Sequence, residues 1–193
     1  MSRENFGNNI CMTSSLSKNS CQKTLLDTIK RALFDNQNDV QNLGAASGFL
    51  PCKTLIIVCF GTPLIAGDAF GPLVADALRE EFDAPVFVYG TTEHPINGKN
   101  MDEWLDFLRV VHKGCEILAI DASLGEKEGG IVVRKDGVCP AAVKGRKRRV
   151  GDVGVLGIVA KCGEDPLMKL LEADFDKVAS LAEFSARLVS EIF

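Results

Sequence analysis

Two aspartates have the residue type and the sequence position for acid–base chemistry. Asp68 lies in the turn 67–72, and Asp121 follows the apolar run 117–120 and begins a second turn. Each follows a segment that predicts a buried parallel strand, so a sheet with these strands side by side brings both carboxyl groups to one edge. Such a pair can share a proton, activate a water molecule or hold a metal ion.

Each aspartate also has a purely structural interpretation. Asp68 can cap the helix that follows it, and Asp121 can fix the turn 122–125. Backbone N–H donors lower the pKa of a carboxyl group, whereas a proton shared by two carboxyl groups raises the pKa of one of them. Catalysis by the pair therefore requires one aspartate to be shielded enough to stay protonated, and otherwise capping or metal binding is favoured.

Further candidates surround this pair in the sequence. The loop 90–99 carries His94 and Asn97, which we predict to contact substrate, although a solvent-exposed histidine is the simpler interpretation of His94.

Lys144 and Arg146 belong to a run with five cations in the six residues 144–149. This run is either a solvated loop or a docking patch for an acidic peptide or for phosphate, and Lys144 and Arg146 are its predicted substrate-binding residues. Asp152 follows the run, and we expect it near the same edge as a third carboxylate.

The elements that must position these residues alternate along the chain. Apolar runs predict strands at 54–60, 85–89, 116–120, 130–134 and 153–160, and helical spacing predicts helices at 21–34, 68–82, 101–111 and 177–192. This alternation indicates an α/β fold, a three-layer α/β/α sandwich of the phosphorylase/hydrolase-like kind with a mostly parallel central sheet. If the strand order begins 2-1-3, the loops with Asp68 and Asp121 flank one crevice.

Composition places the chain among globular proteins. The 193 residues are 46% hydrophobic and 25% charged, with a formal net charge of −4, which argues against a general nucleic-acid binder. We expect residues 1–20 to be a flexible tail and residues 21–193 to form one domain. The seven cysteines contain no C-x-x-C pair and predict reduced thiols, and no apolar run is long enough for a membrane span, so we expect a cytoplasmic protein.

The motifs, taken in order, resemble those of the YyaC-type sporulation proteins. The matching segments are Gly61-Thr62, the run 67–74, 88–91, 119–125, 136–140 and 150–153, followed by 157–159. This family is related to the germination protease of spore formers and, more distantly, to the hydrogenase maturation endopeptidases. The resemblance implies a peptidase-like α/β/α fold and adds Thr62 to the predicted substrate-binding residues.

The resemblance also implies roles for the two aspartates. In the germination protease an aspartate pair is the proposed catalytic centre, which maps to Asp68 and Asp121. In the hydrogenase endopeptidases acidic residues at these two places bind metal with a later histidine, but no histidine follows Asp121 in this chain. We therefore expect no cofactor, and if a divalent metal does bind, its ligands are Asp68 and Asp121, with Asp152 or His94 as a third.

Two main functions follow from these expectations. One is a peptidase of sporulation or germination, acting on a protein or peptide such as the small acid-soluble spore proteins inside the spore. The other is a binding module that kept the crevice, lost turnover and docks its partner with the basic run. Neither function involves a membrane, and the sequence leaves a homo-oligomer open.

Overall fold

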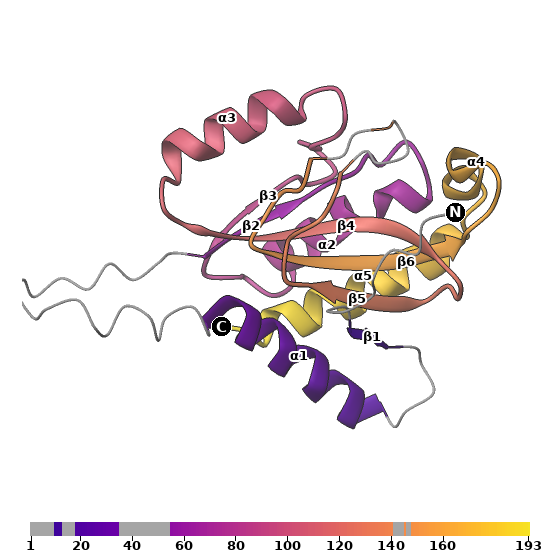
Figure 1. The fold of residues 1–193 in the computed structure, drawn as a ribbon, viewed down its shortest axis with the longest axis horizontal. Helices are drawn as coiled ribbons and strands as arrows, with labels where there is room; N and C mark the ends of the chain where they lie inside the picture. The colour runs from indigo at the N-terminus through magenta and orange to yellow at the C-terminus, as the bar shows by residue number, and fades with distance from the viewer. Residues whose placement is uncertain (1–9, 13–17, 35–54, 141–144, 146–147) are drawn as a thin grey trace, which may run out of the picture.

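The fold is built on a mixed β-sheet. The computed structural model describes residues 10–12, 18–34, 55–140, 145 and 148–193. Within them a six-stranded sheet has the order β1-β5-β6-β4-β2-β3 (Figure 1). The strands are β1 (Ile10–Met12), β2 (Leu55–Cys59), β3 (Phe87–Tyr89), β4 (Glu116–Gly125), β5 (Gly130–Arg134) and β6 (Val153–Lys161). The pairings β3–β2, β2–β4 and β4–β6 are parallel, and β5 and β1 add antiparallel strands at one side.

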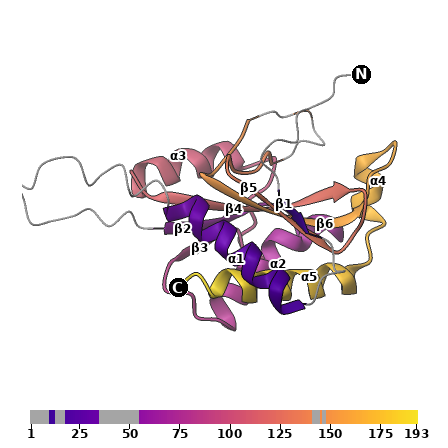
Figure 2. The same ribbon diagram turned by 60° about the horizontal axis from the view of Figure 1, so that its bottom comes forward.

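Helices cover both faces of this sheet. They are α1 (Lys18–Phe34), α2 (Phe70–Glu80), α3 (Met101–Val111), α4 (Pro166–Leu171) and α5 (Phe175–Ser190). Figures 1 and 2 show α3 on one face and α1, α2 and α5 on the other. The predicted three-layer α/β/α sandwich with a mostly parallel sheet is therefore confirmed, and so is the order in which β2 lies between β3 and β4.

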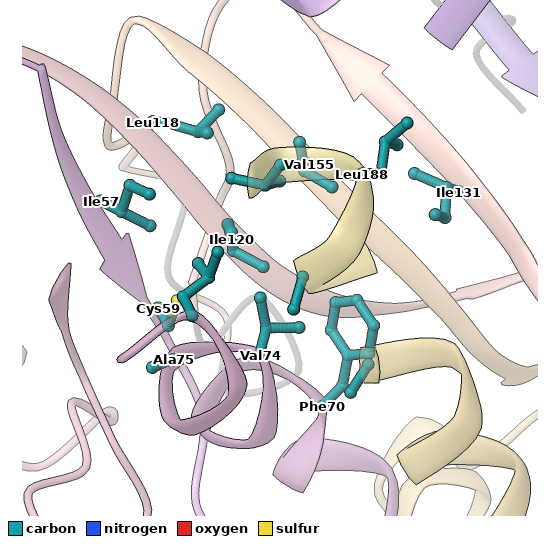
Figure 3. Packing of buried hydrophobic residues seen from close by; sticks show 14 of the residues in the cluster. Ile57, Cys59, Phe70, Val74, Ala75, Leu118, Ile120, Ile131, Val155 and Leu188 are labelled. Atoms are coloured by element: carbon teal, nitrogen blue, oxygen red, sulfur yellow. The ribbon is translucent and has the colours of Figure 1, made fainter. Parts of the chain in front are cut away.

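Two apolar cores follow from this layering, because successive side chains of a strand point to opposite faces. Along β2, Ile57 and Cys59 face the core under α2 and α5, and Ile56 and Val58 face the core under α3. Figure 3 shows the first core, in which Phe70 and other α2 side chains meet the central strands. A strand buried on both faces needs a continuous apolar run, which is the pattern that the sequence of β2 shows.

Several boundaries differ from the sequence-based expectations. The predicted tail 1–20 contains β1, which pairs with β5, and the first residues of α1, so ordered elements begin earlier than expected. Strand β4 runs to Gly125, where the sequence predicted an end at residue 120. Helix α4 was not predicted, because its six residues are too few for a helical pattern to stand out. In the described part of the chain, no helix combines the length and the apolar character needed to cross a bilayer.

Candidate functional site

The site lies where β2 ends and β4 continues. The last β2 residue, Cys59, pairs with Ile120, and the N–H of Phe60 donates to the Ile120 carbonyl at 2.8 Å. The chain then turns away, so Asp121 is the first β4 residue beyond the end of β2. The sequence predicted that Asp121 follows the end of its own strand. This prediction is wrong, because β4 continues past Asp121 and pairs with β6 up to Gly125.

The β2–α2 connection holds Asp68 beside this point. Its carbonyl accepts the N–H of Thr62 at 3.1 Å, which folds the loop back on itself. A Cβ on Gly61 would lie 2.0 Å from the same carbonyl oxygen, and Gly61 has a φ of +138°, so only glycine fits here. Helix α2 has Ala69 as its N-cap, without a side-chain cap hydrogen bond. Asp68 lies in a 3-10 turn, Gly67–Ala69, one residue before this N-cap.

Burial and charge set the state of Asp121. Its side chain is only 7% exposed, and burial raises the pKa of its carboxyl group well above the usual aspartate value. The negative charge of Asp68 raises this pKa further, and the N–H of Ala122, which donates to Oδ1 at 2.9 Å, lowers it. The two aspartates therefore lie close enough for the charge of one to favour the protonated form of the other.

A thiol that the sequence analysis missed lies near Asp121, and a further carboxylate, Asp76, lies near this thiol. Cys59 is fully buried, and its pKa is raised by burial and then by the negative charges of Asp76 and Asp121. Asp76 lies on α2 and accepts the Thr92 hydroxyl at 2.6 Å and the Thr92 N–H at 3.1 Å. A signal was present, because Asp76 is a charged residue among the buried positions Val74–Leu78 of α2, and such residues have partners.

The loop that follows β3 lies next to the end of β2. Phe60 forms a parallel bridge with Ile96, and the N–H of Gly61 donates to the Ile96 carbonyl at 2.9 Å. Within this loop His94 has an exposed side chain, and Asn97 accepts the N–H of Lys99 at 2.9 Å. The Asn97 carboxamide therefore stabilises its own loop.

Thr62 also has a local contact, because its hydroxyl accepts the N–H of Leu64 at 3.4 Å. Contact of Thr62, His94 and Asn97 with a substrate stays a prediction. Lys144 and Arg146 lie outside the described residues.

Asp152 is not at this edge of the sheet. It precedes β6, and its Oδ2 accepts the N–H of Ile117, near the start of β4, at 2.8 Å. The prediction that Asp152 joins Asp68 and Asp121 is therefore wrong, because β6 runs parallel to β4 and its first residues lie at the opposite edge. Among the described residues, no three or more His, Cys, Asp or Glu side chains gather closely enough to hold a metal ion.

The fold and this pair define a class of protein, an α/β/α sandwich that has a buried aspartate with a raised pKa at the carboxyl edge of its central strands. The chain belongs to the family described as "Protein of unknown function (DUF1256)", whose profile matches residues 22–187. It is 31% identical over 141 residues to "Uncharacterized protein YyaC" of Bacillus subtilis (strain 168), covering 72% of this chain and 69% of that protein. The predicted resemblance to the YyaC-type proteins is confirmed.

Solved structures of hydrogenase maturation enzymes are also similar. The [NiFe] hydrogenase maturation protease HycI from Thermococcus kodakarensis KOD1 matches with a TM-score of 0.47 and 20% identity, over 72% of this chain and 92% of that chain. The hydrogenase 2 maturation peptidase from Thaumarchaeota archaeon SCGC_AB-539-E09 has a TM-score of 0.39 and 16% identity, over 72% of this chain and 97% of that chain.

Proposed function

We propose that the protein is a peptidase that hydrolyses peptide bonds with Asp68 and Asp121. The observation that carries the proposal is the state of Asp121, a buried carboxyl group whose pKa is raised by burial and by the charge of Asp68. Two carboxyl groups in different environments can divide the work of acid and base, because one keeps its proton while the other accepts one.

The division of roles follows from burial. Asp68 is half-buried, so water reaches it more easily than it reaches Asp121. The Asp68 carboxylate takes a proton from a water molecule, and the oxygen of this water attacks the peptide carbonyl carbon. Asp121 gives its proton to the departing amine nitrogen as the C–N bond breaks. The proton gained by Asp68 then returns to Asp121 and restores the starting state.

The substrate class comes from the family resemblance. The segments around both aspartates resemble those of spore proteins related to the germination protease, so we propose small acid-soluble spore proteins as substrates and the spore interior as the place of action. Thr62, His94 and Asn97 are the proposed contacts to the peptide, since their loops adjoin the end of β2. If a divalent ion takes part, Asp68 and Asp121 are its proposed ligands.

The proposal is tested by digestion of purified acid-soluble spore proteins, with mass spectrometry of the products. We expect Asp68→Asn and Asp121→Asn to lower the rate by about 10²- to 10⁴-fold, the usual contribution of a general acid or base. Asp152→Asn is the matched control, because the variant amide oxygen can still accept the Ile117 N–H at the opposite edge. Equal rates in all four proteins would reject the aspartate pair. If the mechanism needs no metal, a chelator should leave the rate unchanged. If a chelator abolishes the activity and added Mg²⁺ or Mn²⁺ restores it, the mechanism depends on a metal ion.

A further inference from the structure

A second region that could bind a ligand lies at the amino edge of the central strands. A groove of about 410 Å³ is lined by the end of α3, by the turn that leads into β4, and by residues just before β6. Cys115 and Ile117 at the start of β4 and Gly151 before β6 lie in its wall. Asp121 lies further along β4, beyond the end of β2, so the groove is separate from the aspartate pair. Its volume is in the range that holds a small molecule.

The charged side chains that line this groove have one sign. Arg109, Lys113, Arg148 and Arg149 line it, and none of its lining residues is an aspartate or a glutamate. The chain as a whole has a net charge of −4, so a groove lined by four cations differs in sign from the rest of the protein. A further groove in the described part of the chain, between α2 and α5, is lined by carboxylates and by no cation, so the two grooves differ in the sign of their charge.

The partners of these arginines can be exchanged for a ligand. Arg109 pairs with Asp106 at 2.6 Å and Arg148 with Asp102 at 3.8 Å, and these aspartates lie outside the groove lining. Arg149 binds Asp136 through two contacts of 3.1 Å, from Nε to Oδ2 and from Nη1 to Oδ1, so this pair is firmer. All these carboxylates are exposed, and single exposed ion pairs are weak, so an anion with several oxygens can compete for the guanidinium groups of Arg109 and Arg148.

The groove also has a rigid apolar side. Leu105 and Leu108 of α3 line it together with His112. His112 shares a 2.6 Å hydrogen bond with the Tyr89 hydroxyl, and its ring centroid lies 5.0 Å from that of Phe87. A ring held in this way offers a fixed flat surface, and such a surface suits an apolar or aromatic part of a ligand.

We propose that this groove binds a small phosphate ester that carries a flat ring system, of the class of a nucleoside diphosphate. Guanidinium groups match phosphate oxygens in pairs, and Lys113 adds a point charge. The part of the groove beside His112 receives the base. Phosphate is favoured over a single carboxylate because four cations converge on one groove.

Isothermal titration calorimetry with adenosine diphosphate tests this proposal, with pyrophosphate and adenosine titrated separately. We expect one site per chain, with adenosine diphosphate bound more tightly than either part, and weaker binding at higher salt. Lys113→Ala and Arg148→Ala should each weaken binding by about tenfold or more, because each removes a charged contact. The matched controls are Lys127→Ala in the β4–β5 turn and Arg79→Ala on α2, which remove the same charge from exposed positions and should bind as the wild type does. Circular dichroism of each variant confirms that it is folded.

Three results would overturn the proposal. The first is the absence of heat of binding for adenosine diphosphate at millimolar concentrations. The second is equal weakening by the groove variants and the controls, which would mean that only the net charge matters. The third is binding of an acidic peptide or of single-stranded nucleic acid at the groove in place of the nucleotide. None of these results depends on peptidase activity, so they leave the proposed function untouched.

Discussion

Replacing Asp121 by asparagine should stabilise the protein at neutral pH. Asparagine has nearly the same shape, its side-chain oxygen can still accept the N–H of Ala122, and its amide is a hydrogen-bond donor, as a protonated carboxyl group is. The substitution removes the ionisation that burial and the charge of Asp68 oppose. A residue that lowers the stability of the fold is expected where that residue serves a function.

The magnitude and sign follow from the raised pKa. For the wild type, the stability linked to the Asp121 proton is fully present below the ordinary aspartate pKa of 3.8 and is lost as pH rises toward the higher pKa of the folded state. Within this window the wild type loses about 1.4 kcal/mol per pH unit through this residue. The variant has no such dependence, so its stability advantage should grow with pH from about pH 4 upward.

Urea denaturation followed by circular dichroism measures this difference between about pH 4 and about pH 8. Asp106→Asn is the control, because Asp106 is exposed on α3 and its pair with Arg109 lies at the surface, where ion pairs contribute about 0–1 kcal/mol. A difference between Asp121→Asn and wild type that stays constant over this range would refute the argument. Asp121 would then titrate alike in the folded and unfolded chain and could not be the group that holds a proton.

Three further outcomes are expected. Gly157→Ala should destabilise the fold by about 1–3 kcal/mol in urea, because the new Cβ would lie 2.5 Å from the fully buried ring of Phe70, and unchanged stability would contradict this packing. Asp174→Ala should cost about 1 kcal/mol, since the carboxylate accepts two N–H groups at the start of α5, and an unaltered melting temperature would exclude the cap. Iodoacetamide should modify exposed Cys162 in the folded protein and leave Cys59 unmodified, because burial raises the pKa of the Cys59 thiol, and early labelling of Cys59 in a peptide-resolved mass spectrum would oppose it.

Much of the fold was predictable because its signals are local. The apolar run of β2 and the helical spacing of α3 and α5 each depend on a few neighbouring residues, and their elements lie within two residues of the predicted places. The errors have a common origin in long-range pairing. β1 exists by pairing with β5, and β4 extends to Gly125 because β6 continues beside it. A short strand or a strand extension of this kind leaves little pattern in its own sequence.

The candidate site was predictable only in part. The turn around Asp68 and the strand before Asp121 identified the two carboxylates, and the parallel order brought them to one edge. The same reasoning misplaced Asp152, because the sequence does not show at which edge of the sheet a strand begins. β5 runs antiparallel to β6, and β6 starts beside the start of β4. The Asp76–Thr92 contact joins residues sixteen positions apart, and it depends on how α2 packs beside the loop after β3.

The sequence by itself determined the kinds of elements, the family and the two aspartates, since periodicity and motif residues are properties of neighbours along the chain. Only the tertiary structure decided that Asp121 is buried beside the charge of Asp68, and that cations from α3 and from the residues before β6 meet in one groove. The physical reason is that burial and electrostatic potential depend on distances between all parts of the folded chain, and these distances exist only after the strands have paired and the helices have packed.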